Sequence, residues 1–171
     1  MELTVSSQRR KARAVKVGKV IIGGGFPISI QSMTNTDTRD VAATVAQIKL
    51  LFEAGCDIVR LSVPNSEAAK QLKTIRRQVE QPLVADIHFQ YKLALAAVAA
   101  GFDKIRINPG NIGEPWKVRE VTRACREAGI PIRIGVNSGS LPKDLLEKYS
   151  PDDPEVFVEA ALREIHILEE M

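Results

Sequence analysis

Cysteine and aromatic residues are scarce in this sequence, and the net charge is small. The two cysteines, Cys56 and Cys125, lie far apart and form no Cys-x-x-Cys motif. A disulfide framework is therefore not expected, nor is a metal site built within the chain. The net charge of +3 is too slight to indicate a nucleic-acid partner. The hydrophobic content of 44% is ordinary for a soluble domain with one sizeable core.

Long apolar runs are missing as well. No stretch approaches the roughly 20 apolar residues that a membrane-spanning helix needs. Residues 1–18 are polar and basic, without the apolar segment of a signal peptide. We therefore expect a cytoplasmic protein with no membrane partner. The Gly23-Gly24-Gly25 run lacks the Gly-x-Gly-x-x-Gly spacing of a dinucleotide loop.

Three similar segments stand out in what is present. Each is a short apolar run that follows an Ala-Gly pair and carries an arginine near its middle. The runs are Asp57–Asn65, Lys104–Asn111 and Pro131–Asn137, with Arg60, Arg106 and Arg133 as their arginines. Short apolar runs bounded by proline and glycine predict buried strands. The pattern therefore predicts a repeated helix–glycine–strand unit.

Predicted strands and helices alternate along the chain. A small hairpin is expected at Val15–Ile22, around Gly18 and Lys19. Strands are expected at Pro27–Met33, Asp57–Val63, Pro82–His88, Lys104–Asn108 and Pro131–Asn137. Helices are expected at Asp40–Ala54, Glu67–Val79, Tyr91–Ala100, Trp116–Ala128, Leu141–Tyr149 and Pro154–Glu169. This alternation predicts a parallel sheet, either a doubly wound open sheet or a (β/α) barrel.

The distribution of apolar and charged side chains between the two faces of each strand distinguishes these two architectures. In Pro131–Asn137, Ile132 and Ile134 share one face, whereas Arg133 and Asn137 share the other. An open sheet covered by helices needs two apolar faces, but a barrel can use its inner face as a site near the carboxyl ends of its strands. We therefore predict an α/β fold, a TIM-type barrel that is incomplete, with about five of the eight units.

The inward arginines predict an anion inside the barrel. Unpaired buried charge costs several kcal/mol per group, and Asp86 alone cannot balance three arginines. Guanidinium groups bind phosphate oxygens through two parallel hydrogen bonds, so a phosphate or diphosphate is expected. Asp86 and His88 share the inward side and form a candidate acid–base pair. The alternative is that the arginines pair with acidic residues outside the sheet.

Several long motifs are shared with one known family. They are Gln31-Ser32-Met33-Thr34, Ala85-Asp86-Ile87-His88-Phe89, Arg106-Ile107-Asn108-Pro109-Gly110-Asn111-Ile112-Gly113 and Arg133-Ile134-Gly135-Val136-Asn137-Ser138-Gly139-Ser140-Leu141. On these motifs the chain resembles the N-terminal part of the bacterial 4-hydroxy-3-methylbut-2-enyl diphosphate synthase family. That family acts in the methylerythritol phosphate route to isoprenoids. The resemblance runs from Arg9 to the last predicted helix.

The resemblance implies a reductive activity. Family members open 2-C-methyl-D-erythritol 2,4-cyclodiphosphate with two electrons from ferredoxin or flavodoxin, and they form homodimers. They carry a 4Fe-4S cluster in a separate C-terminal domain, with three cysteines and a glutamate as ligands. Residues 1–171 are thus expected to be the N-terminal part of the barrel domain, without the iron–sulfur domain and inactive alone. Cys56 and Cys125 are not expected to replace the cluster ligands.

The resemblance also implies roles for individual residues. The expected substrate-binding residues are Arg60, Arg106, Arg133, Asn137, Gln31, Asn108 and Asn111. Asp86 and His88 resemble the polar pair near the substrate, and no residue is expected to bind a metal. Two other functions remain open. The first is another barrel enzyme of an anionic substrate, such as a pterin-diphosphate synthase, and the second is a non-enzymatic anion-binding module.

Overall fold

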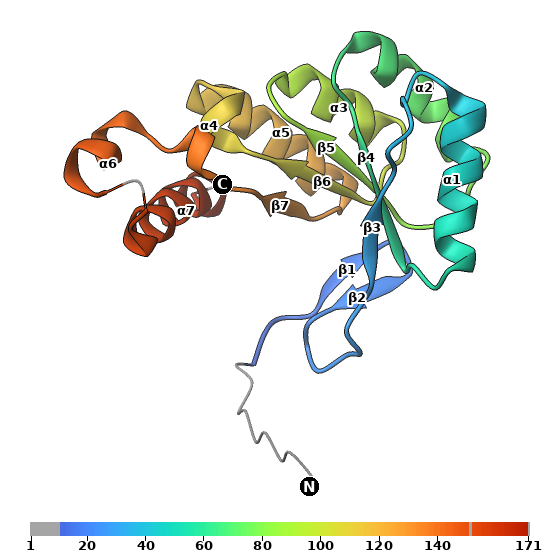
Figure 1. Cartoon of the computed structure of the whole chain (residues 1–171), viewed down its shortest axis with the longest axis horizontal. Helices are drawn as coiled ribbons and strands as arrows, with labels where there is room; N and C mark the ends of the chain where they lie inside the picture. Colours follow the sequence, from blue (N-terminus) through green and yellow to red (C-terminus); the bar gives the residue numbers. More distant parts are fainter. Residues whose placement is uncertain (1–10, 151, 171) are drawn as a thin grey trace, which may run out of the picture.

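A computed structural model describes residues 11–150 and 152–170, and its centre is a five-stranded parallel sheet (Figure 1). A separate antiparallel hairpin of β1 (Val15–Val17) and β2 (Val20–Ile22) lies beside the amino ends of these strands. The strands of the sheet are β3 (Gln31–Met33), β4 (Ile58–Ser62), β5 (Leu83–Ile87), β6 (Lys104–Ile107) and β7 (Ile132–Ile134).

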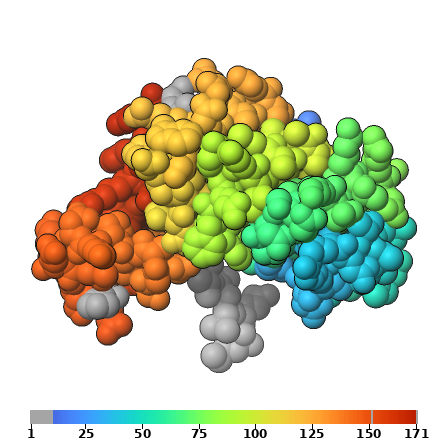
Figure 2. All heavy atoms as spheres, turned by 90° about the horizontal axis from the view of Figure 1, so that it is seen from above, coloured from blue at the N-terminus to red at the C-terminus, as the bar shows by residue number. Residues whose placement is uncertain are grey.

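The strand order follows the chain, β3-β4-β5-β6-β7, and every neighbouring pair is parallel. The longer helices are α1 (Val41–Glu53), α2 (Ser66–Arg76), α3 (Tyr91–Ala99), α5 (Pro115–Ala128) and α7 (Pro154–Glu169). Successive units lie side by side in sequence order when viewed from above (Figure 2). A doubly wound sheet would reverse its strand order at a switch point. The barrel prediction is therefore confirmed over a doubly wound sheet.

Local signals in the sequence set the helix ends. Asp40 begins α1, where its carboxylate accepts a hydrogen bond from the Ala43 N–H at 3.0 Å. Asn65 does the same for α2 through the Ala68 N–H, also at 3.0 Å. Gly129 ends α5 with a φ of 67°, a left-handed conformation that suits glycine.

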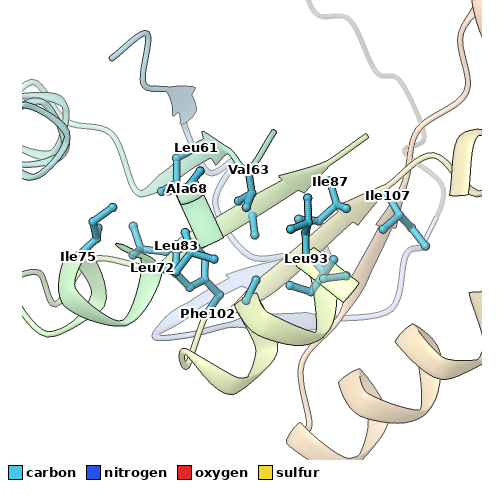
Figure 3. Close-up of a cluster of buried hydrophobic side chains, with 14 of the residues drawn as sticks. Leu61, Val63, Ala68, Leu72, Ile75, Leu83, Ile87, Leu93, Phe102 and Ile107 are labelled. Carbon is cyan, nitrogen blue, oxygen red and sulfur yellow. The ribbon is translucent and has the colours of Figure 1, made fainter. Parts of the chain in front are cut away.

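The main core lies between the sheet and its helices. Leu61, Leu83 and Ile87 of the strands pack with Leu72 of α2 and Phe102 of the α3–β6 loop, and all are at most 2% exposed (Figure 3). Burying a side chain of this size stabilises the fold by about 1.5–3 kcal/mol. The alternating phase of the sequence correctly predicted these helix-facing positions.

The opposite, inner face of the sheet has an apolar layer at its amino end. Ile58 and Val84 are fully buried there against Val17 of the hairpin, and Val20 and Ile22 pack around them. The hairpin thus excludes water from the floor of the inner face. Beside these apolar residues the same face carries Gln31 and Lys104 at the starts of β3 and β6, and its other polar residues lie toward the carboxyl ends of the strands.

Two predicted strands are shorter than expected. Only Gln31–Met33 of the expected strand Pro27–Met33 pairs with β4, and Ile28 and Ile30 are 75% and 60% exposed. The Ile30 N–H donates to the Asp57 carboxylate at 2.7 Å instead of joining a strand ladder. The expected strand Pro131–Asn137 is reduced to Ile132–Ile134, because no strand pairs with its outer edge in the described chain.

Short helices occupy the carboxyl end of the sheet. They are α4 (Pro109–Ile112), the 3-10 turn η1 (Ser138–Ser140) and α6 (Lys143–Lys148). The helix expected at Leu141–Tyr149 is confirmed as the shorter α6, whereas α4 was not expected. Among the described residues, no helix has the length and apolarity required to span a membrane.

The two edges of the sheet lead to a prediction about assembly. In the described chain β3 and β7 each have one strand neighbour, so each leaves backbone donors and acceptors unpaired. Phe26, Ile28 and Ile30 are exposed beside β3. We expect the 171-residue protein to associate with rising concentration, or to melt at low temperature. Light scattering and thermal unfolding check this.

The double change Ile28→Ser and Ile30→Ser should reduce the association. Leu50→Ser, which alters a 64% exposed side chain on α1, is the matched control and should leave it unchanged. A monodisperse wild-type monomer with a high melting temperature would contradict the prediction.

Candidate anion-binding site

A buried carboxylate lies at the centre of the polar inner face. Asp86 is 4% exposed and stands on β5, directly beside Arg106 in the register with β6. Its Oδ1 accepts a hydrogen bond from Arg106 Nη1 at 3.1 Å, and its Oδ2 lies 3.6 Å from Arg60 Nε on β4. Asp86 therefore holds the arginines of both neighbouring strands on one face. The alternative pairing of Arg60 and Arg106 with acids outside the sheet is wrong.

His88 follows β5 and lies at the wall of the same group. Its Nε2 is 3.4 Å from Asp86 Oδ2, and its side chain is 42% exposed, so it contacts both the carboxylate and solvent. The expected neighbourhood of Asp86 and His88 is thus observed. A histidine held by a carboxylate has one ring nitrogen fixed, and the other can face a bound molecule.

Arg133 completes the row of arginines. It stands on β7 directly opposite Arg106 in the parallel register, and its residue surface is exposed. Within the described chain, no acid pairs with its guanidinium. Arg60 has a further contact, because its Nε donates to Met33 Sδ at 3.2 Å. Two of the three arginines share Asp86, and the third is available to a ligand.

The predicted amide residues divide into two groups. Gln31 lies on the floor of the inner face, where its Oε1 accepts from Lys104 Nζ at 3.3 Å. Asn108 is buried at the rim, and its Nδ2 donates to Ser140 Oγ at 2.7 Å. That hydrogen bond ties the loops after β6 and β7 together. Asn137 begins the η1 turn beside Ser140.

Asn111 lies in α4, where its backbone N–H donates to the Asn108 carbonyl at 2.9 Å. No hydrogen bond joins its side chain to the arginines in the described structure. Asn108, Asn111 and Asn137 are therefore rim residues, and their expected contacts with a substrate stay predictions.

Lys104 is an inner-face cation that was not among the predicted site residues. It is 7% exposed and lies two residues before Arg106 on β6, hence on the same face. Burial, followed by the nearby charges of Arg133 and Arg60, lowers the pKa of its ammonium below the usual 10.5. The period of two along the strand was the signal that could have identified it.

These residues make the inner face strongly electropositive. Four cations, Arg60, Arg106, Arg133 and Lys104, stand against the single carboxylate of Asp86. Such a surface suits an anion with two or more charges, bound through guanidinium hydrogen bonds. A hollow of about 740 Å³ lies elsewhere, between Lys11 and the Ile22–Ser29 segment, and none of the four cations lines it.

The described residues do not fit an iron–sulfur cluster. They contain no group of three or more His, Cys, Asp and Glu that could hold a metal. Cys56 and Cys125 are 4% and 1% exposed, and burial raises the pKa of the Cys125 thiol to about 12. The Cys56 thiol donates to the Ile58 carbonyl at 3.0 Å. Both thiols are therefore structural rather than thiolate ligands.

Gly135 controls the position of Arg106. A Cβ at residue 135 would overlap the Arg106 guanidinium, at 2.6 Å from Nε. We predict that Gly135→Ala displaces Arg106 from Asp86 and weakens binding of inorganic pyrophosphate about tenfold, the loss of one charge-assisted hydrogen bond. Calorimetric titration measures this. Gly139→Ala is the matched control, since its Cβ would meet only Asn137 Oδ1 at 3.6 Å. Equal affinities for wild type and Gly135→Ala would show that Arg106 does not bind the anion.

Several solved structures with a similar fold are dihydropteroate synthases. The enzyme of Xanthomonas albilineans with 4-aminobenzoic acid has a TM-score of 0.59 and 17% identity, covering 90% of this chain and 62% of that chain. The enzyme of Stenotrophomonas maltophilia with bound imidazole has a TM-score of 0.59 and 20% identity, covering 83% and 55%. At such identities the likeness shows the fold alone.

Sequence relatives are much closer. The chain is 58% identical over 164 residues to a protein of Symbiobacterium thermophilum, covering 96% of this chain and 44% of the relative. It is 60% identical to a protein of Acidithiobacillus ferrooxidans, covering 96% and 45%. Both relatives are named 4-hydroxy-3-methylbut-2-en-1-yl diphosphate synthase (flavodoxin). The chain spans about half the length of the curated relatives it matches.

A family model of the GcpE TIM-barrel domain matches residues 12–171. That range includes every strand of the sheet and all of the inner-face residues described above. The chain therefore belongs to the GcpE family, and the family's TIM-barrel domain accounts for nearly all of its length.

Proposed function

We propose that this chain is the substrate-binding part of an oxidoreductase of isoprenoid biosynthesis. The proposed reaction converts 2-C-methyl-D-erythritol 2,4-cyclodiphosphate to 4-hydroxy-3-methylbut-2-enyl diphosphate. The observation that carries the proposal is the excess of buried and half-buried cations around Asp86 on one face of the sheet. The names of relatives at 58% and 60% identity, which specify a diphosphate synthase, support the choice of ligand.

The geometry supports a role for each of these residues. The guanidinium groups of Arg60, Arg106 and Arg133 bind the diphosphate oxygens, and Asp86 fixes the first two in place. Gln31 lies below this group, and Asn108, Asn111 and Asn137 lie at the rim. Preorganised charge of this kind acts strongly where the hairpin and core exclude water.

His88 and Asp86 are the proposed proton-handling pair. Asp86 Oδ2, at 3.4 Å from His88 Nε2, orients the imidazole, and solvent reaches the partly exposed ring. The imidazole can therefore hold or transfer a proton at the edge of the bound diphosphate. The arginines and Asp86 position the substrate and provide the electrostatic field around it.

The electrons must come from elsewhere. Ring opening by reduction needs two electrons, which none of these side chains supplies, and the proposed 4Fe-4S cluster provides that chemistry when bound. Since the described cysteines do not fit the cluster, we assign it to a part of the protein beyond this barrel portion. Flavodoxin, named in the relatives, is the proposed electron donor, with ferredoxin as the alternative. The proposal includes a cytoplasmic homodimer.

Arg133→Ala tests the ligand assignment. A hydrogen bond to a charged group contributes about 1.5–3 kcal/mol, so the affinity for the cyclic diphosphate should fall roughly 10- to 100-fold. Calorimetric titration should use a protein that carries this chain at the full length of its relatives. Arg77→Ala, at the exposed end of α2, is the matched control and should bind like wild type. Equal affinity of Arg133→Ala and wild type would contradict the role of Arg133.

The 171-residue chain should reduce nothing by itself. An iron–sulfur cluster requires four ligands, and the two cysteines of the sequence lie in separate units. We expect colourless protein after anaerobic purification with iron and sulfide, and no turnover of the cyclic diphosphate with a reduced donor. A visible cluster absorbance band, or turnover, would show that a redox centre lies within this chain and would contradict the prediction.

A further inference from the structure

Lys104 occupies a distinct layer of the inner face. It stands on β6 opposite Val84, whereas Arg106 stands one pleat higher opposite Asp86. Its Nζ donates to Gln31 Oε1 on β3 at 3.3 Å, although β4 and β5 lie between these strands in the sheet. The side chain therefore reaches across the inner face at the level of Val84 and Ile58, below the layer of Asp86.

The ammonium of Lys104 has no acidic partner among the described residues. The charged and titratable groups on this face are Arg60 from β4, Asp86 and His88 after it from β5, Arg106 from β6 and Arg133 from β7. Asp86 already contacts Arg60, Arg106 and His88. The Lys104 ammonium instead donates a hydrogen bond to a neutral acceptor, the amide oxygen of Gln31.

A cation in this position is costly without an anion. At 7% exposure, Lys104 has lost most of its hydration, and two arginines repel its charge. A bound anion with two or more charges would offset both penalties. Lys104 is buried and has no acidic partner among the described residues. Both observations favour the same anionic ligand as the row of arginines.

We propose that Lys104 is a further positioning residue of the diphosphate site, which forms its charged floor and holds the Gln31 amide beneath the bound ligand. This inference rests on the proposed function. Lys104 acts from the layer below Arg106 and Arg133, at the level of Arg60, so it strengthens the attraction for the whole ligand without replacing the guanidinium contacts. The loss of affinity on substituting Lys104 should therefore be smaller than the loss on substituting Arg133.

The position of Lys104 also makes binding depend on pH. In the ligand-free protein, burial together with Arg133 and Arg60 holds the pKa of Lys104 below 10.5. A bound diphosphate favours the ammonium and raises this pKa again. Between the two pKa values, binding takes up a proton, and affinity therefore falls as pH rises through the ligand-free pKa.

The same shift affects stability with a definite sign. Because the folded pKa lies below the unfolded value, the charged lysine destabilises the ligand-free fold at neutral pH. The penalty is relieved as pH rises from the folded pKa toward 10.5. Lys104→Met should therefore keep or raise the melting temperature at neutral pH.

Titration with inorganic pyrophosphate tests the inference. Wild type, Lys104→Met and Lys104→Arg are compared between about pH 7 and 10, in two buffers of different ionisation enthalpy. We expect Lys104→Met to bind about 3- to 10-fold more weakly at pH 7, since its charge acts through an effective dielectric of about 20. Lys104→Met should also lose part of the proton uptake. Pyrophosphate contributes its own protonation equally to each titration, so the difference between variants isolates Lys104.

Lys104→Arg and a control variant, Lys49→Met, separate the charge of Lys104 from its proton uptake. Arginine at position 104 stays charged over the whole pH range, so Lys104→Arg should bind pyrophosphate without the extra proton uptake. This variant still tests the inference if Lys104→Met fails to fold. Lys49→Met removes an exposed lysine of α1 and should match wild type in affinity and proton uptake. Identical affinity and uptake in wild type and both Lys104 variants would overturn the role of Lys104 alone. Failure of wild type to bind pyrophosphate would overturn the proposed function and this inference with it.

Discussion

The carboxylate of Asp86 lies between the guanidinium groups of two neighbouring strands. It is nearly inaccessible to solvent, and its oxygens face Arg106 Nη1 at 3.1 Å and Arg60 Nε at 3.6 Å. A buried carboxylate is stable only with such partners, and the partners are stable there only with it. Removing both arginines leaves an uncompensated buried carboxylate, and removing Asp86 leaves two partly exposed guanidinium groups without their acidic partner. Asp86 thus holds Arg60 and Arg106 in position. Because one carboxylate faces several cations, the inner face keeps a net positive charge.

The fold provides the setting for that pair. A singly wound parallel sheet places all of its longer helices against one face. The apolar residues of the strands point toward that face and pack against the helices. The other face is sealed at its amino end by the hairpin, through Val17, Ile58 and Val84. The Arg60, Arg106 and Asp86 charges above this floor are partly shielded from solvent, which strengthens their attraction for an anion. The glycine at 135 leaves the space that the Arg106 side chain occupies.

Sequence alone predicted the sheet, its helices and the inward arginines, because a period of two along a strand is independent of tertiary detail. It did not predict the short edge strands, since the pairing of Gln31–Met33 and Ile132–Ile134 depends on which neighbours are present. The inward side of Lys104 follows from the same period, but its reach to Gln31 requires the curvature of the sheet. The rim bond between Asn108 and Ser140 likewise depends on two loops that meet only in the folded chain.

A crystal structure of the full-length protein with the cyclic diphosphate would reveal whether the inward arginines bind it. We expect diphosphate oxygens at hydrogen-bonding distances of about 2.7–2.9 Å from the guanidinium groups of Arg60, Arg106 and Arg133. Asp86 should still bridge the first two. A diphosphate bound elsewhere, for example in the hollow beside Gly23–Gly25 at the hairpin, would contradict it.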